Sequence, residues 1–182
     1  MNLPSRIYLT GFMASGKSTV GPLLAREVGY RFIDLDAFVE AREGQPLAGL
    51  FASGGEAAFR SAERAALEET TRMARVVVST GGGTLANEAN LQTALGAGVV
   101  VHLRAPEPLV LRRLRRGRLR PLLLDAHGER LTGAALEARV QELLAARAPF
   151  YARAHLTVDS TAAPPRAVAR TLVRTLAAQF PS

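Results

Sequence analysis

The chain has 182 residues, a length that suits one domain with a sizeable hydrophobic core. Its hydrophobic content of 48% and mean hydropathy of +0.08 exclude an intrinsically disordered protein. No apolar run approaches the roughly 20 residues of a membrane span, the N-terminus lacks a signal-peptide pattern, and the absence of cysteine excludes disulfides and thiolate metal sites. We therefore expect a cytoplasmic protein without a membrane partner.

The net charge of +7 raises the question of a nucleic-acid partner. The arginines are scattered, and aromatic residues make up only 5% of the chain, so no stacking platform for bases is visible. We expect no nucleic-acid partner. A positive field also suits an enzyme with polyanionic substrates.

The first predicted elements are a strand at residues 6–10, a glycine-rich loop and a helix from about residue 20. Residues 11–19 fit the pattern G-x-x-x-x-G-K-[ST] at every fixed position. In this context the pattern predicts a phosphate-binding loop (P-loop), in which Lys17 reaches the outer phosphates and the Ser18 hydroxyl binds Mg²⁺. The alternative is a plain glycine turn. Lys17 is the only lysine in the chain, which favours a function.

A second strand, residues 30–34, leads into two carboxylates, Asp34 and Asp36. The carboxyl end of a strand is where open α/β sheets place their chemistry, so both side chains are candidate site residues. Asp36 also suits the N-cap of a helix that begins at Ala37, and the two roles are compatible.

Residues 44–51 and 54–63 are predicted to form two short helices separated by glycine turns. Arg60 and Glu63 are three residues apart on the second helix. Such a pair is usually a solvated ion pair, so spacing alone favours no function for Arg60.

Residues 75–80 form a continuous β-branched run, typical of a buried parallel strand, and lead directly into Gly81-Gly82-Gly83. The glycines suggest a close approach of backbone to a ligand, with a plain turn as the alternative. A helix at 87–95 and a strand at 98–103 follow. His102 lies inside that strand, and we expect it to be a core histidine.

Six arginines fall between residues 112 and 120. This segment is either a solvated helix end or part of a lid, at about 112–130, whose arginines close over a triphosphate. The last predicted elements are a helix at 133–148 that is interrupted at Pro149, a strand at 155–159 and a helix at 166–179.

Several segments occur in an order that resembles the shikimate kinase family. They are residues 11–19, Asp34-Leu35-Asp36, Gly55-Glu56 with Phe59-Arg60 and Glu63, Gly81-Gly82-Gly83, Arg120-Pro121-Leu122-Leu123, and residues 147–151. The P-loop alone is shared by many NTPases, and the combination is far more selective. The resemblance extends from about Ile7 to Pro165.

The resemblance implies an α/β fold of the P-loop NTPase class that is similar to nucleoside monophosphate kinases. Its features are a five-stranded parallel sheet in the order 2-3-1-4-5, helices on both faces and a mobile lid. All would lie within one kinase domain, residues 1–182, with shikimate-binding helices at about 36–63. The implied reaction is Mg²⁺-dependent transfer of the ATP γ-phosphoryl group to the 3-hydroxyl group of shikimate, a step toward chorismate and the aromatic amino acids.

The family's site residues carry over to matching positions of this chain. Asp36, Lys17 and Arg120 are the implied catalytic residues, and Ser18 and Asp34 the implied Mg²⁺ ligands, Asp34 acting through water. The implied ATP-binding residues are Ala14, Ser15, Gly16, Lys17, Ser18, Thr19, Arg113, Arg120 and Pro165. The implied shikimate-binding residues are Asp36, Phe51, Phe59, Arg60, Glu63, Gly82 and Arg147, with Leu47 beside the phenylalanines.

Two other readings remain. A small P-loop kinase for another acceptor, such as gluconate, shares the loop and a carboxylate pair. A basic regulatory or nucleic-acid-binding module would use residues 112–120 to bind phosphodiesters.

The chain also departs from the family at Ala162-Ala163, where an arginine near the nucleotide is common. We expect a monomer, since no large apolar surface is evident.

Overall fold

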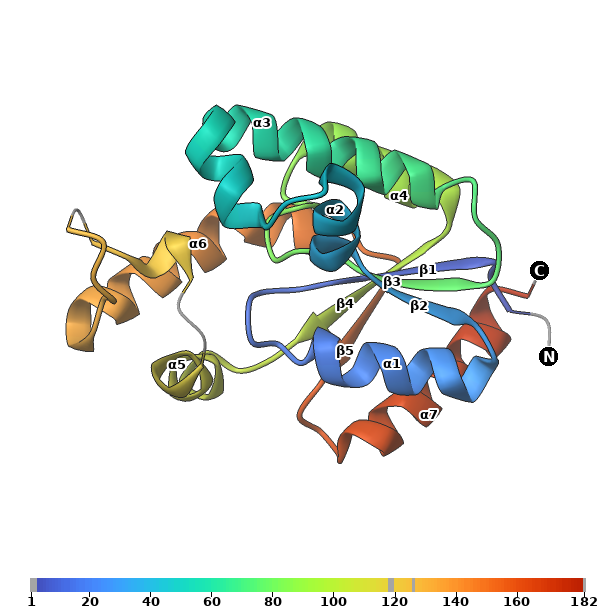
Figure 1. Ribbon diagram of the computed structural model, residues 1–182. Coiled ribbons are helices and arrows are strands. Elements are labelled where there is room, and N and C mark those ends of the chain that lie inside the picture. The colour runs from blue at the N-terminus through green and yellow to red at the C-terminus, as the bar shows by residue number, and fades with distance from the viewer. Residues whose placement is uncertain (1–2, 118–119, 126, 182) are drawn as a thin grey trace.

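The computed structural model describes residues 3–117, 120–125 and 127–181, so residues 118, 119 and 126 of the predicted lid, Arg118 among them, lie outside the described residues. Its centre is a five-stranded sheet in the order β2-β3-β1-β4-β5 (Figure 1). All four strand pairs are parallel. The predicted fold class and strand order are therefore confirmed.

The strands are short and rich in β-branched residues. They are β1 (Arg6–Thr10), β2 (Arg31–Asp34), β3 (Val76–Ser79), β4 (Val99–Arg104) and β5 (Leu156–Asp159). Every residue of β3 is buried, as expected of a strand covered on both faces. Each strand lies within one residue of its predicted position at either end.

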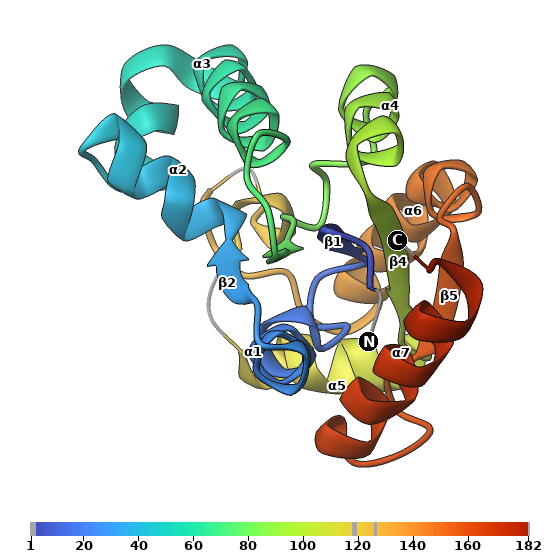
Figure 2. The ribbon, with the colours of Figure 1, turned by 90° about the vertical axis from the view of Figure 1, so that its right-hand side faces the viewer.

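Seven α-helices and one 3₁₀ turn in the described parts of the chain connect these strands. They are α1 (Lys17–Val28), α2 (Leu35–Glu43), α3 (Leu47–Thr70), α4 (Glu88–Ala97), α5 (Glu107–Arg116), η1 (Pro121–Leu123), α6 (Gly133–Tyr151) and α7 (Pro165–Gln179). Helices α1 and α7 lie on one face of the sheet, and α3 and α4 lie on the other (Figure 2). No helix in the described ranges combines the length and apolar character that crossing a bilayer requires.

Three hydrophobic clusters hold the layers together. One joins the sheet to α1 and α7, and includes Leu9, Leu24 and Leu172. A second joins the opposite face to α2, α3 and α4. The third lies beyond the carboxyl ends of the strands, where Phe12 and Met13 of the glycine loop pack with residues of α5 and α6. The loop is thereby fixed to the helices on either side of the predicted lid.

The strand order changes direction at β1, which lies between β3 and β4: β2 and β3 are added on one side of it, and β4 and β5 on the other. Connections therefore leave β1 and β3 on opposite faces of the sheet. Such a switch point opens a crevice at the carboxyl ends of the strands, where α/β proteins bind ligands. The glycine loop and the glycine triplet both begin at this edge.

The helix cap that was predicted at Asp36 is wrong. The N-cap of α2 is Asp34, whose Oδ1 accepts the N–H groups of Asp36 and Ala37 at 3.1 and 3.3 Å. Asp36 lies in the first turn of the helix. The helix begins directly at the end of β2, so the capping position is two residues earlier than the pattern indicated.

Two predicted helix boundaries also differ from the structure. The two helices predicted within residues 44–63 form one element, α3, which extends to Thr70 and is broken at Gly55, where φ is 67° and ψ is −166°. This conformation is essentially confined to glycine. In α6, Pro149 does not end the helix, which continues to Tyr151. Only two helical residues follow Pro149, and the missing N–H of the proline removes a single intrahelical bond.

Candidate active site

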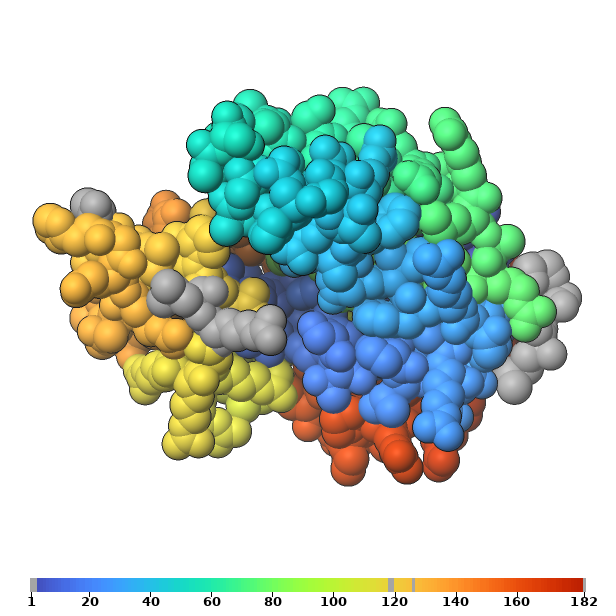
Figure 3. All heavy atoms as spheres, viewed as in Figure 1, coloured from blue at the N-terminus to red at the C-terminus, as the bar shows by residue number. Residues whose placement is uncertain are grey.

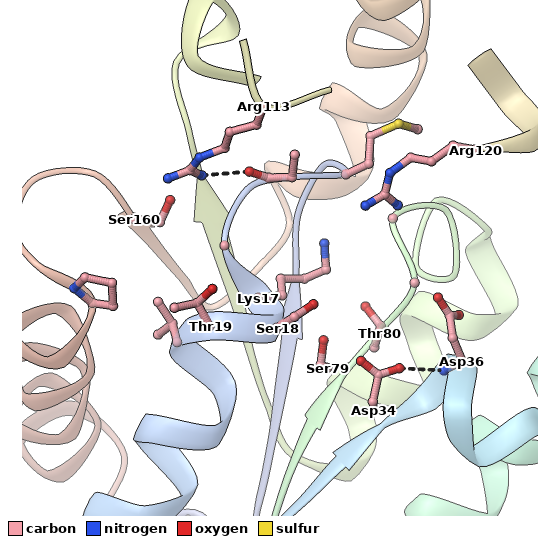
Figure 4. Close-up of a pocket in the computed structure, with 17 residues that line it drawn as sticks. Lys17, Ser18, Thr19, Asp34, Asp36, Ser79, Thr80, Arg113, Arg120 and Ser160 are labelled. Carbon is pink, nitrogen blue, oxygen red and sulfur yellow. Dashed lines mark hydrogen bonds between the residues drawn. The ribbon is translucent and has the colours of Figure 1, made fainter. Parts of the chain in front are cut away.

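A cavity of about 320 Å³ opens over the glycine loop at the carboxyl ends of the strands (Figure 4). Eleven of the predicted site residues line it. They are Ala14, Gly16, Lys17, Ser18, Thr19, Asp34, Asp36, Gly82, Arg113, Arg120 and Pro165. In the space-filling view, the surface is hollowed between the region of α2 and α3 and the segment around residue 120 (Figure 3).

The loop has the strained backbone that its sequence requires. Gly11 and Gly16 have φ values of 145° and 106°, and Ala14 has a φ of 62°. A Cβ atom on Gly11 would lie 2.4 Å from the carbonyl oxygen of Leu103, so only glycine fits between the loop and β4. Ser15 is fully buried and does not line this cavity, so its predicted contact with ATP stays a prediction.

Lys17 is the buried cation at the centre of the cavity. Its Nζ donates to the carbonyl oxygens of Gly11 and Phe12 at 2.7 and 3.1 Å. Burial lowers the pKa of Lys17 to about 8, and the positive charge of Arg120 adds to this effect. The group remains mostly protonated at neutral pH and donates to acceptors at the mouth of the loop.

Asp34 and Asp36 lie on the side of Lys17 that faces away from Arg113 (Figure 4). Burial raises the pKa of Asp36 to about 6, with further contributions from the negative charges of Asp34 and Glu63. A carboxylate with this pKa is ionised at neutral pH and is a competent proton acceptor.

Two predicted ATP-binding arginines enter the cavity from opposite sides (Figure 4). The Nη1 of Arg113 donates to the Ala14 carbonyl oxygen at 2.7 Å and therefore holds the strained residue of the loop. Arg120 approaches from the side of the carboxylates, and burial lowers its pKa. Their positions bracket the space above Lys17.

A second cavity, of about 650 Å³, borders the predicted acceptor residues Arg60, Glu63 and Arg147. Arg60 donates to Glu63 at 2.8 Å, and the buried Glu63 also accepts the Thr84 hydroxyl at 2.5 Å. Arg60 is therefore more than a solvated helix residue. Its partner carboxylate is 2% exposed and fixes the direction of the guanidinium.

Arg147 is the more deeply buried of the two acceptor-side arginines, with 6% of its surface exposed. Its guanidinium lies 5.4 Å from the centre of the Phe12 ring. Its Nη1 has no hydrogen-bond acceptor among the described residues. A buried guanidinium with an unpaired donor is costly unless a ligand anion completes its bonding, so this group fits a carboxylate.

The glycine triplet is the wall between the two cavities. Gly81 and Gly82 line the first cavity, and Gly83 lines the second. A Cβ on Gly82 would lie 3.3 Å from both Arg147 Nη1 and Met13 N, and a Cβ on Gly83 would lie 3.4 Å from Arg147 Nη2. Side chains here would push the acceptor arginine away from the P-loop.

Phe51 and Phe59 line neither cavity. Their rings stack on each other at 4.6 Å, and the Arg60 guanidinium lies 5.1 Å from the Phe59 ring centre. Leu47 packs against the core cluster below α3. Their predicted contact with shikimate stays a prediction.

Six residues that line the first cavity were not among the predicted site residues: Met13, Val20, Ser79, Thr80, Gly81 and Ser160. Met13 and Gly81 nevertheless lie in the glycine loop and the glycine triplet, the two segments that the sequence did indicate. Ser79, Thr80 and Ser160 share one signal, since each lies at the carboxyl end of a strand. Ser160 is buried after β5, and its hydroxyl donates to the backbone carbonyl of Ser15. It connects the loop before α7 to the P-loop.

The cavity suits a magnesium nucleotide. Within the described ranges, no group of three or more acidic, histidine or cysteine side chains could hold a metal alone. Ser18, at the start of α1, and Asp34, at the end of β2, offer two oxygen ligands near Lys17 (Figure 4). Mg²⁺ keeps several waters and takes further oxygens from substrate phosphates, so two protein groups are enough.

Known proteins were compared with the chain by sequence and by structure. A family model described as shikimate kinase matches residues 13–177. A shikimate kinase of Chlorobium chlorochromatii is 45% identical over 159 residues, which is 87% of this chain and 84% of that protein. The structure of a shikimate kinase from Acinetobacter baumannii in complex with shikimate has a TM-score of 0.85 at 32% identity, covering 97% of this chain and 94% of that one. A gluconokinase of Sinorhizobium meliloti, at a TM-score of 0.63 and 24% identity over 98% and 94% of the two chains, shares the fold alone.

Proposed function

The chain belongs to the shikimate kinase family, and we propose that its two adjoining cavities divide the family's reaction between them. In that reaction the γ-phosphoryl group of ATP is transferred, with Mg²⁺, to the 3-hydroxyl group of shikimate, on the route to chorismate and the aromatic amino acids. The P-loop cavity binds the phosphoryl donor. The cavity beside Arg60 and Arg147 binds the carboxylate of the acceptor.

On the donor side, the loop N–H groups, Lys17 and Arg120 hold the phosphate oxygens. Ser18 and, through water, Asp34 would hold Mg²⁺, which would supply positive charge to neutralise the phosphates. Arg113 and Pro165 flank the adenine, at the end of the cavity away from the carboxylates. Positioning and charge stabilisation supply most of the rate in phosphoryl transfer, and this cavity contains the groups for both.

On the acceptor side, Arg60 and Arg147 bind the shikimate carboxylate as two guanidinium forks. Glu63 orients Arg60, and Gly82 forms the wall against which the ring lies. Phe51 and Phe59 contact its apolar side. The carboxylate at one end of the acceptor thus directs the hydroxyl at the other end toward Asp36.

Asp36 aligns the 3-hydroxyl group and accepts its proton as the oxygen bonds to phosphorus and the bond from phosphorus to the ADP oxygen breaks. Lys17 and Arg120 stabilise the negative charge on the transferring group and on the departing ADP. Closure of the segment at about 112–130 excludes water, which would otherwise compete as an acceptor.

The observation that carries this proposal is the shared glycine wall: one short segment borders both the P-loop cavity and the arginine pair. The test is ADP release from ATP and Mg²⁺ with shikimate, with gluconate and without acceptor. Strong stimulation by shikimate alone supports the proposal. Stimulation by gluconate alone would keep the donor side and overturn the roles of Arg60, Gly82 and Arg147.

We further propose that the enzyme acts in the cytoplasm as a monomer, with residues 1–182 forming one kinase domain and without nucleic-acid or membrane partners. The absence of cysteine fits a reducing compartment. Light scattering coupled to gel filtration tests the oligomeric state. A salt-sensitive mobility shift with DNA or RNA would contradict the assignment of the 112–120 arginines to ATP.

A further inference from the structure

Tyr151, the last residue of α6, contacts the glycine wall and packs in the same hydrophobic cluster as Phe12 and Met13 of the P-loop. It is 5% exposed, and its hydroxyl donates to the carbonyl oxygen of Gly82 at 2.9 Å. No other donor to this carbonyl is found among the described residues. Tyr151 lies one helical turn after Arg147, so the two side chains reach the same glycine segment from one face of α6.

Two polar groups act on the Tyr151 hydroxyl: the Gly82 carbonyl oxygen, which accepts its hydrogen bond, and the nearby Arg147 guanidinium. The ring stacks on His102 of β4, with centroids 4.6 Å apart and planes 15° apart. Beside both rings lies a third cavity, of about 730 Å³, bordered mainly by apolar residues. Packing is therefore incomplete on that side, and the bond to Gly82 fixes where the end of α6 meets the triplet.

Holding the Gly82 carbonyl also fixes the peptide that follows. The structure contains no cis peptide bond in its described residues, so the Gly82 carbonyl and the Gly83 N–H belong to one planar trans unit and point in opposite directions. A glycine pair has many alternative backbone conformations, and this bond selects one of them. In that conformation, Cβ atoms added to Gly82 and Gly83 would lie 3.3 and 3.4 Å from nitrogens of the Arg147 guanidinium, so the bare glycine backbone lies beside this group.

We propose that Tyr151 is a positioning residue for acceptor binding, which acts by holding the Gly82–Gly83 peptide in a fixed position beside the Arg147 guanidinium. This inference rests on the proposed function of the acceptor cavity. The His102 ring stacks on one face of the Tyr151 ring and limits its movement. Burial lowers the pKa of His102 to about 4, so the stacked pair is uncharged at neutral pH. Burial raises the pKa of Tyr151, so its hydroxyl keeps the donated proton.

The test is Tyr151→Phe, which keeps the ring stack on His102 and removes only the hydroxyl group. We expect the KM for shikimate to rise about three- to tenfold, the range of one buried neutral hydrogen bond, while kcat and the KM for ATP stay within twofold. Shikimate binding by titration calorimetry should weaken by the same factor. Calorimetry is suitable because the chain has no tryptophan as a fluorescent reporter.

The matched control is Tyr30→Phe, because the Tyr30 hydroxyl also donates to a backbone carbonyl, that of Leu3 at 3.3 Å, in the core cluster beside α1 and α7. Its kinetic constants should match the wild type. An unchanged KM for shikimate in Tyr151→Phe, or an equal rise in the control or in the KM for ATP, would overturn the positioning role. If the wild-type enzyme itself gave no shikimate-dependent ADP release, the proposed function would fail instead.

Discussion

The donor side and the acceptor side of the active site are built in different ways. On the donor side, five of the lining residues come from the single segment 14–19, and the loop folds around its own lysine. On the acceptor side, Arg60 comes from α3, Gly82 from the segment after β3, and Arg147 from α6. The first depends on local backbone geometry, and the second depends on how three elements pack.

This difference has a consequence for mutations. If the proposed roles are correct, a substitution on the donor side removes a group that contacts the transferring phosphate and should lower kcat. A substitution on the acceptor side changes the placement of the bound ring and should raise the KM for shikimate. Substitutions that separate these two effects test whether the division is real.

The largest effect is expected for Lys17→Ala. Loss of the buried cation should lower kcat by roughly 10²-fold or more, the scale of one electrostatic group in a transition state. Stopped assays of ADP release measure this effect. Arg26→Ala, on the exposed side of α1, is the control and should retain wild-type turnover. Turnover near the wild-type rate in Lys17→Ala would remove the assigned role.

Asp36→Asn should lower kcat by roughly 10²-fold while making the folded enzyme more stable. The folded-state pKa of Asp36 is raised to about 6, so its charge destabilises the native state above that pH, and this cost is lost as the pH falls through 6 toward 4. Removing the charge should raise the free energy of unfolding at pH 7.5 by on the order of 1 kcal/mol, or Tm by about 2–4 °C.

The gain in stability of Asp36→Asn should vanish near pH 4, which a pH series of thermal unfolding can measure. Asp34, rather than Asp36, caps α2, so the substitution leaves the helix start intact. Asp159→Asn is the control: hydrogen bonds from Thr161 lower the pKa of Asp159, so its loss should not stabilise the fold. If Asp36→Asn were less stable than the wild type at pH 7.5, the expected direction of the stability change would be wrong.

Arg60→Ala should raise the KM for shikimate roughly 10- to 100-fold, as expected for a charge-assisted hydrogen bond, and leave the KM for ATP unchanged. Arg153→Ala is the control, because Arg153 pairs with the exposed Glu88 at 2.6 Å and lines neither of the two cavities. An equal KM for shikimate in the two variants would show that Arg60 is an ordinary surface residue without a role in acceptor binding.

The pH dependence of kcat/KM for ATP reports ionisations of the free enzyme. We expect an acid limb near pH 6, where Asp36 gains its proton, and a basic limb near pH 8, where Lys17 loses its proton. Each limb should fall about tenfold per pH unit beyond its midpoint. The acid limb should disappear in Asp36→Asn, and its persistence there would assign it to another group.

The smallest effect is expected for Gly55→Ala, which tests the frame of the acceptor side. The backbone at Gly55 has a φ of 67°, and an alanine there meets no neighbour but is strained by about 1–3 kcal/mol. We expect a lower free energy of unfolding and a few-fold rise in the KM for shikimate. Gly96→Ala in α4 also meets no neighbour, has an ordinary backbone, and should be neutral or stabilising.

The sequence predicted the strands and the position of the glycine loop well, because these depend on patterns within a few residues. The strand order was implied by the resemblance to the family and is confirmed by the sheet. A β-branched run followed by G-x-x-x-x-G-K-[ST] leaves little freedom for the backbone. The role of Arg60 could not be derived in this way. Its spacing to Glu63 is that of an ordinary helix pair, and only the buried partner and the approach of Arg147 set it apart.

The missed features share a physical cause, since each depends on a contact between distant segments. Ser160 bonds to Ser15 across 145 residues, and Tyr151 bonds to Gly82 across 69. The cap of α2 was placed two residues late because the end of β2 is set by its pairing with β3. Pro149 was expected to end α6, but packing of Tyr151 beyond it continues the helix.

Asp34 illustrates how narrowly a single position can be constrained. One of its oxygens accepts two N–H groups and starts α2, and the carboxylate borders the cavity where Mg²⁺ is proposed to bind. Serine or asparagine would start the helix but carry no charge. Glutamate would carry the charge but move its oxygens one methylene away from the helix start. Saturating substitution at this position should therefore return several folded variants, and full activity only for aspartate.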